Sequence, residues 1–194
     1  DPLRTDDTLT ATVVASDADG DAVTLDYEWS VNGAVVQSGA SNSLASSFFV
    51  RGNVVSVAVT PSDANSSGAT VMDGLTVENT APTSPAVSIS PAAPVEGLDD
   101  LVCTASGSTD ADGDSVIYSF AWTVDGVSYN AASTSGATST VLGSDTLAAE
   151  LWECTATPND SYEDGQPLSA SVSIESDWAG ALTFTNCGNS GNSG

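Results

Sequence analysis

The sequence contains no histidine and no lysine, and its only basic residues are Arg4 and Arg51. Against these two stand 26 acidic residues, which give a formal net charge of -24. Nucleic acids and anionic lipid surfaces are bound through lysine and arginine, so both kinds of partner are excluded. Isopeptide crosslinks are excluded as well, because they require a lysine. Two explanations of the acidity stay open: solubility in a salty medium, and cation binding at specific loops.

The same absences make an enzyme difficult to build. Serine and threonine are abundant, but no histidine or lysine is present to serve as their base. Hydrolysis by a pair of carboxylates stays formally open because acidic residues occur throughout the chain. We therefore expect a protein without enzymatic activity.

Long apolar stretches are also missing. The most apolar runs, such as 54–59, have the length of a strand rather than of a membrane span, so no membrane insertion is expected. No segment shows helical periodicity over three turns, and valine and threonine outnumber the good helix formers. Hydrophobic residues make up 40% of the chain, too many for a disordered protein. These features predict a folded, all-β protein.

The sequence is built from two copies of one unit. The motif DADGD occurs at 17–21 and again at 110–114, and Trp29 and Trp122 are related by the same offset of 93 residues. The later motif TP-x-D, which ends at Asp63 and Asp160, is offset by 97 residues, so the second copy has gained four residues in between. The Ser/Thr/Gly-rich stretch 131–146 is the expected place for this gain.

Each copy is expected to contain short strands joined by tight turns. In the first copy the strand-like segments are 9–14, 23–31, 54–59 and 71–78. The dipeptides Asn32-Gly33 and Asp125-Gly126 predict hairpins, because both turn positions require a positive φ. Regularly spaced short strands of this kind predict an all-β fold of two tandem immunoglobulin-like β-sandwich domains.

The tryptophans fit such a sandwich, in which the third strand often carries a buried indole. Trp29 and Trp122 precede the hairpin turns at one strand position. We expect both in the cores, and the alternative is a pair of surface rings that stack on sugars.

Two of the three cysteines have the spacing of a disulfide between the sheets of an immunoglobulin-like sandwich. Cys103 lies on the second strand of the second copy and Cys154 on its penultimate strand. The first copy has Thr10 and Val57 at the matching positions, so both partners are absent together. A disulfide implies an oxidising, extracellular or cell-surface location. The state of Cys187 stays open.

The two DADGD loops are candidate calcium sites, because alternating carboxylates around a glycine turn offer several of the oxygen ligands that calcium prefers. The loop after TP is expected at the same end of the sandwich and adds one more carboxylate to each set. The alternative is a solvated turn, since Asp and Gly form turns without a metal. The expected ligand sets are Asp17, Asp19, Asp21 with Asp63, and Asp110, Asp112, Asp114 with Asp160.

These motifs resemble the immunoglobulin-like, PKD-like or cadherin-like repeats of bacterial and archaeal surface proteins and adhesins. The resemblance rests on DADGD, the aromatic-x-Trp pairs (Tyr27/Trp29 and Phe120/Trp122), the hairpin turns and TP-x-D, over about residues 6–176. It implies stalks, spacers or adhesive elements that calcium often stiffens.

The domain pattern we expect is 1–80, a sandwich without its first strand; 81–177, a sandwich with the disulfide; and 178–194, a surplus strand with a flexible tail. The surplus strand 181–186 takes the place of the first strand of a following unit, and Leu182 and Phe184 alternate as if to face a core. This predicts a homopolymer in which the surplus strand completes the open sandwich of the next molecule. Two alternatives are an excerpt of a longer repeat chain and a strand that folds back on its own molecule.

We therefore expect a self-assembling filament or surface-stalk subunit. The alternatives are an adhesion or carbohydrate-binding module of a larger surface protein and a non-catalytic domain of a secreted enzyme. In the first alternative, exposed aromatics such as Tyr129, Tyr162 or Trp178 would contact the ligand. Asn65 and Asn159 begin N-x-S sequons in equivalent loops and are candidate glycosylation sites, so a glycan is a further candidate partner.

Overall fold

The computed structural model describes residues 2–176, and this part of the chain consists of strands, turns and two short 3-10 segments. No helix in the described part is long and apolar enough to span a membrane. The elements of the first sandwich are β1 (Leu3–Arg4), β2 (Leu9–Thr10), β3 (Thr24–Val31), β4 (Ala34–Gly39), β5 (Ser43–Leu44), η1 (Ser46–Phe48), β6 (Val54–Ser62) and β7 (Val71–Glu78). Those of the second are β8 (Ala86–Ser90), β9 (Leu101–Ser106), β10 (Ile117–Val124), β11 (Val127–Tyr129), β12 (Ser133–Ser135), β13 (Thr138–Val141), η2 (Gly143–Asp145), β14 (Leu151–Asn159) and β15 (Leu168–Ser173).

The chain divides into two compact units that do not coincide with these two sets of strands. Among the described residues, the first comprises 2–86 together with Ser106–Ser119 and Thr157–Leu168, and the second comprises Val87–Ala105, Phe120–Ala156 and 169–176. Both acidic loops therefore belong to the first unit. The expected domain boundaries at residues 80 and 177 stay predictions.

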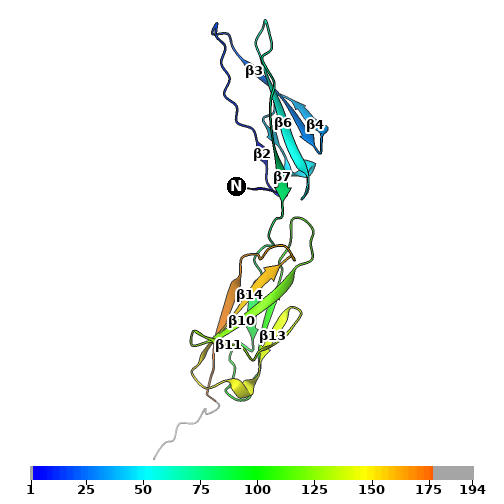
Figure 1. Cartoon of the computed structure of the whole chain (residues 1–194). Helices are drawn as coiled ribbons and strands as arrows, with labels where there is room; N and C mark the ends of the chain where they lie inside the picture. The colour runs from blue at the N-terminus through cyan, green and yellow to red at the C-terminus, as the bar shows by residue number, and fades with distance from the viewer. Residues whose placement is uncertain (1, 177–194) are drawn as a thin grey trace, which may run out of the picture. The chain divides into compact units, whose positions relative to one another are not determined.

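The first sandwich pairs a five-stranded sheet, in the order β1-β7-β6-β3-β4, with a two-stranded sheet, β2-β5. Figure 1 shows β3, β6 and β7 as its long strands. The hairpin between β3 and β4 turns at Asn32 and Gly33, which have φ values of 50° and 80° as the dipeptide predicts. Trp29 is buried at the centre of the core, together with Leu44 and Val55.

The second sandwich consists of two four-stranded sheets, β11-β10-β14-β15 and β12-β13-β9-β8. Cys103 on β9 and Cys154 on β14 form the predicted disulfide, which links the two sheets. Trp122 and Trp152 are buried beside it, with their ring centroids 6.2 Å apart in an edge-on arrangement. The prediction of an all-β fold with two tandem immunoglobulin-like sandwiches is confirmed, and so are both core tryptophans.

The structure corrects the register of the second strand in the first copy. Leu9 pairs with Leu44 as Leu101 pairs with Val141, so Ala11 rather than Thr10 takes the position of Cys103. The apolar alternation decides this register, because a slip of one residue would turn Thr10 into the core.

The sequence suggests Tyr129 as one of the candidate surface aromatics, but the structure places it against the core. Its ring packs edge-on against Trp152 with the centroids 4.8 Å apart, and its hydroxyl donates to Asp145 Oδ2 at 2.5 Å. Burial and this hydrogen bond raise the pKa of Tyr129 to about 12. It is a packing residue of the second sandwich rather than a surface ring that stacks on a sugar.

The disulfide is expected to contribute about 4 kcal/mol to the stability of the second sandwich, because it closes a loop with a sequence separation of 51 residues. Replacing Cys103 and Cys154 together with alanine should lower the free energy of unfolding by this amount in urea titrations followed by tryptophan fluorescence. Cys187→Ser is the control, since it removes a thiol and leaves the disulfide intact. An unchanged midpoint in the double variant would show that packing alone holds the sheets together.

The raised pKa of Tyr129 predicts a pH dependence. A phenol that titrates near 10 in the unfolded chain and near 12 in the folded one stabilises the fold fully below about pH 10, and this stabilisation is lost as the pH rises toward 12. Melting temperatures should therefore fall more steeply over this window in the parent chain than in Tyr129→Phe. Parallel curves for the two chains would contradict the assignment.

Candidate functional site

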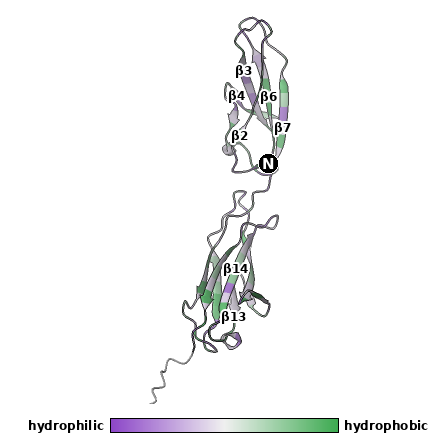
Figure 2. Ribbon diagram, turned by 90° about the vertical axis from the view of Figure 1, so that its left-hand side faces the viewer, coloured by the Kyte–Doolittle hydropathy of each residue, from purple (hydrophilic) through white to green (hydrophobic). Residues whose placement is uncertain are grey.

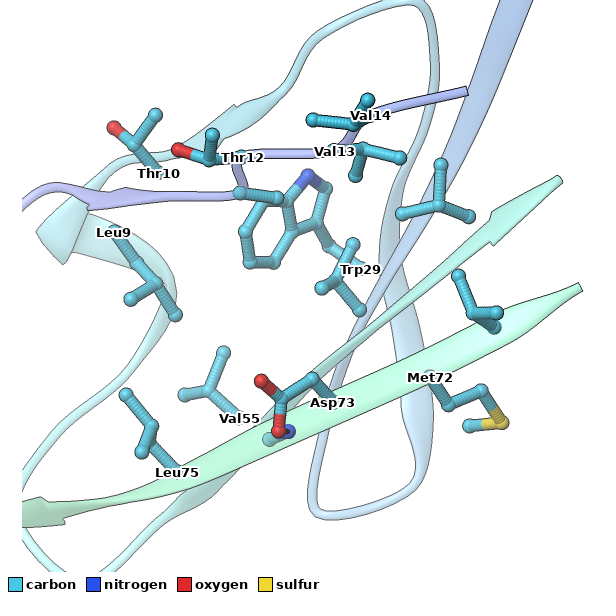
Figure 3. A pocket seen from close by; sticks show the side chains of 15 residues that line it. Leu9, Thr10, Thr12, Val13, Val14, Trp29, Val55, Met72, Asp73 and Leu75 are labelled. Atoms are coloured by element: carbon cyan, nitrogen blue, oxygen red, sulfur yellow. Dashed lines mark hydrogen bonds between the residues drawn. The ribbon is translucent and has the colours of Figure 1, made fainter. Parts of the chain in front are cut away.

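The first sandwich has an open apolar groove between the segment 9–14 and strand β7. Its volume is about 460 Å³. Figure 3 shows Leu9 on one side of the groove and Leu75 on the other, and the ring of Trp29 lies beside the 9–14 segment. The groove therefore opens directly onto the core.

The groove exists because the inward face of β7 is uncovered. Leu75 pairs with Val55 and Val71 with Val59, and paired residues lie on the same face of a sheet. Val55 and Val59 are buried, whereas Leu75 is 47% and Val71 57% exposed. Figure 2 shows the apolar stretches of β7 in green. Apolar side chains at inward positions thus lie open to solvent.

The second sandwich shows what covers the corresponding face. Val172, which matches Leu75 at the offset of 97 residues, is only 8% exposed. Val87 and Ile89 from β8 pack against the same core. The first copy has no strand equivalent to β8 among the described residues, so the groove marks the place of that strand.

The opposite wall of the groove is irregular. We predicted a strand over 9–14, but only Leu9–Thr10 form a ladder, with β5 as their partner. The equivalent strand β9 lies between β13 and β8 and runs for six residues. With no second neighbouring strand among residues 2–176, residues 11–14 leave the strand conformation, and Val14 is 97% exposed.

The inner wall also carries one carboxylate. Asp73 pairs with Val57, so it shares the inward face with Leu75, and it takes the position that Ala170 has in the second copy. Asp73 is exposed at the rim of the groove. A strand that fills the groove must leave the Asp73 carboxylate in contact with water or supply hydrogen-bond donors to it. The predicted donor residues, Leu182 and Phe184, lie outside the described residues.

The first acidic loop brings Asp17 and Asp21 together with Asp63. One carboxylate oxygen from each of the three lies within 4.8 Å of those of the other two, and Asp19 is not part of this group. Asp63 Oδ1 accepts hydrogen bonds from the backbone N–H groups of Asn65 and Ser66 at 2.7 and 2.6 Å. These bonds lower the pKa of Asp63. The sequence prediction that the TP-x-D loop lies beside DADGD thus matches this geometry.

The second acidic loop gathers Asp110, Asp112 and Asp114 within the same limit of 4.8 Å. The Asp112 side chain is only 1% exposed. Thr5 donates its hydroxyl to Asp112 Oδ1, and Thr80 donates its backbone N–H to Oδ2 at 2.7 Å. Both oxygens of this buried carboxylate are therefore satisfied within the first unit.

Arg51 joins this loop, and no sequence motif indicated it. Its guanidinium donates to both carboxylate oxygens of Asp114 and lies 3.9 Å from Asp112 Oδ2. It also stacks over the ring of Tyr162, 4.2 Å from the centroid, and donates to Asn79 Oδ1 at 2.5 Å. The hydrogen bond to Asp114 raises the pKa of Arg51 further.

Asp160 does not join the second carboxylate group. It is 2% exposed and accepts hydrogen bonds from Asn79 Nδ2 at 2.8 Å and from the backbone N–H groups of Tyr162 and Glu163. Burial by itself raises its pKa, but these hydrogen bonds to the charged form outweigh it, so the pKa is lowered. In this geometry Asp160 acts as a structural acceptor.

The two groups differ in how well they suit a divalent cation, which takes six to eight oxygen ligands when it is calcium. Asp17, Asp21 and Asp63 each keep one carboxylate oxygen that accepts no hydrogen bond from the described residues. The second group keeps only Asp110 Oδ2, which is buried and has no partner in the described part of the chain. The donor set of the first loop therefore fits calcium, and that of the second is largely occupied.

The two candidate glycosylation sites are also unlike. Asn65 is exposed, and its side-chain amide makes one long bond of 3.4 Å to Asp21 Oδ2. Asn159 donates its amide to Asp164 Oδ1 at 2.7 Å and accepts from the N–H of Ser161. Only the first asparagine presents an amide nitrogen that makes no short hydrogen bond and is free to carry a glycan.

No protein-family model and no curated protein matches the chain. Among solved structures it is similar to a two-domain fibronectin type III segment of chicken tenascin, with 12% identity over 90% of this chain and 95% of that one and a TM-score of 0.41. It is also similar to the fibronectin(III)-like modules of Clostridium thermocellum CbhA, with 13% identity over 95% and 94% and a TM-score of 0.35. The chicken interferon gamma receptor alpha chain matches at 10% identity over 90% and 95%, with a TM-score of 0.47.

Proposed function

We propose that this chain is an extracellular structural subunit that joins head to tail, with residues 181–186 of one copy completing the groove of the next. The observation that carries the proposal is the open groove on the first sandwich, where inward residues such as Leu75 lie exposed. Uncovered strand edges invite pairing with another chain. An added strand would supply both backbone hydrogen bonds and a cover for the core.

The proposed occupant fits the groove in pattern and in charge. At the offset of 97 residues, Leu182 and Phe184 match Pro85 and Val87, which are buried and half-buried in the second copy. Residues 181–186 carry no charge, although the whole chain has a net charge of -24. This segment therefore avoids repulsion by Asp73 at the groove.

A contact of this kind uses different surfaces on the two partners. Such heterologous contacts repeat without closing and generate filaments. An extracellular setting is supported by the disulfide between Cys103 and Cys154, which persists in oxidising compartments. The proposed role requires no catalytic group.

Calcium is proposed to stiffen the subunit at the first acidic loop. Asp17, Asp21 and Asp63 converge there from two loops, so an ion bound to all three would tie those loops together. Extracellular modules bind calcium with Kd values of about 0.1–1 mM, which suits a loop of this exposure.

Charges placed on the proposed donor strand should abolish assembly. Leu182→Asp with Phe184→Asp puts two carboxylates at the positions proposed to face the core, and light scattering and electron microscopy should then show monomers only. The matched control is Thr183→Asp with Thr185→Asp, which adds the same charge on the other face and should still assemble. Equal assembly of the two variants would contradict strand addition.

A crosslinking experiment identifies the source of the strand. One chain carries Leu75→Cys and the other Phe184→Cys, both with Cys187→Ser, and mild oxidation should link the two chains. A link that forms only within a chain carrying both cysteines would show that the strand folds back. A link that forms in neither case would leave the groove to another occupant and overturn the proposal.

Calcium at about 10 mM should raise the unfolding free energy by roughly 1.4–2.7 kcal/mol, given a Kd of about 0.1–1 mM. The shift should disappear in Asp17→Asn with Asp21→Asn and remain in Asp26→Asn, which alters an exposed carboxylate on β3. Melting curves with calcium and with chelator measure it. A shift of equal size in all three chains would indicate nonspecific screening.

A further inference from the structure

The two DADGD loops have the same sequence and share one set of turn hydrogen bonds to the first aspartate. Asp17 Oδ1 accepts hydrogen bonds from the N–H groups two and four residues further on, at 2.8 and 3.2 Å. Asp110 Oδ1 accepts the equivalent pair at 2.9 and 3.1 Å. Gly20 and Gly113 turn the two loops with φ values of 84° and 83°. Any difference in cation binding between the loops therefore comes from what faces them.

We propose that Arg51 is the resident cation of the second loop, so that this loop excludes calcium while the first remains open to it. The guanidinium is bidentate on Asp114 and lies close to Asp112, the two carboxylates that a metal would need. A planar guanidinium matches a carboxylate with two parallel hydrogen bonds, which a lysine does not reproduce.

Arg51 is held in this place by groups outside the loop. Tyr162 lies under the guanidinium, and Asn79 accepts a hydrogen bond from it. At the backbone, the neighbouring Gly52 has a φ of 83° and donates its N–H to Val77 O at 2.8 Å. An incoming ion would have to break all the side-chain contacts before it reached Asp114.

The remaining carboxylate oxygens offer calcium little. Five of the six oxygens of Asp110, Asp112 and Asp114 accept hydrogen bonds, and Asp110 Oδ2 is the exception. Calcium requires six to eight oxygen ligands, so one free oxygen does not hold it. Removing Arg51 frees both oxygens of Asp114 and restores a set with three available oxygens, as in the first loop.

The first loop has no comparable cation. Every ion pair among the described residues involves Arg4 or Arg51, and Arg4 pairs with Glu163 at 3.1 Å. Since the sequence has no other basic side chain, Asp17 and Asp21 have no arginine or lysine to neutralise them. The proposed difference in calcium binding between the two loops therefore follows from the position of one arginine.

The test uses the full chain with Asp17→Asn and Asp21→Asn, which keep the side-chain acceptors of the turn and remove the first site. In this background, calorimetry should show no calcium binding up to about 10 mM while Arg51 is present. Adding Arg51→Gln should create one site with a Kd of roughly 0.1–1 mM. Adding Asp114→Asn to that chain should remove the site again.

Two controls make the result specific. Arg4→Gln removes the same charge at the pair with Glu163 and should create no site. Should Arg51→Gln fail to fold by circular dichroism, Tyr162→Ala replaces it, because this ring is 68% exposed and its removal loosens Arg51. Calcium binding in the Arg51-containing background, lost on Asp114→Asn, would overturn the proposal. The absence of any gain in a folded variant that frees Arg51 would overturn it too.

Discussion

A β-sandwich is stable where the inner face of each sheet is covered, and the first sandwich meets this condition along only part of β7. At one end, β1 pairs with β7 and Leu3 and Val77 are both buried. Further along the same strand, Val71 and Leu75 face inward and remain exposed. Burial of apolar area is the dominant favourable term in folding, so this uncovered face is a source of free energy for association.

The second sandwich shows the same architecture with the condition fulfilled. β8 lies at the edge of its sheet, and Val87 and Ile89 pack against the core that contains Val172. The disulfide then joins the two covered sheets. Within the described part of the chain, the first copy has neither feature and holds its core with Trp29, Leu44 and Val55. It is therefore the copy whose core remains open to a partner strand.

Charge is the second constraint on this molecule. A net charge of -24 opposes the close approach of copies, and it also opposes the gathering of carboxylates within one copy. The fold gathers them at both DADGD loops nonetheless, and relieves the repulsion in different ways. Backbone N–H groups hold Asp63 in the charged form, and the Asn79 side-chain amide together with backbone N–H groups does the same for Asp160. Arg51 neutralises Asp114. In the first group, Asp17, Asp21 and Asp63 each keep a carboxylate oxygen that accepts no hydrogen bond from the described residues.

Local chemistry and periodicity made much of this fold predictable. The hairpin at Asn32-Gly33 follows from the positive φ that both positions require. The core position of Trp29 and Trp122 follows from their place on a repeated strand, and the disulfide follows from two cysteines that are present in one copy and absent together in the other. The loop motifs also predicted that Asp63 lies near Asp17.

The sequence by itself determined the repeat, the all-β class, the hairpins and the disulfide, because each can be read from residues that are close in the chain or from a comparison of the two copies at a fixed offset. Only the tertiary structure decided the register that turns Leu9 and Ala11 inward, since that depends on which residue of β5 pairs with Leu9. It alone placed Arg51 on Asp114, residues 63 positions apart with no motif to connect them. It alone showed that the face of Leu75 lies open, because exposure depends on which strands cover a residue rather than on its own side chain.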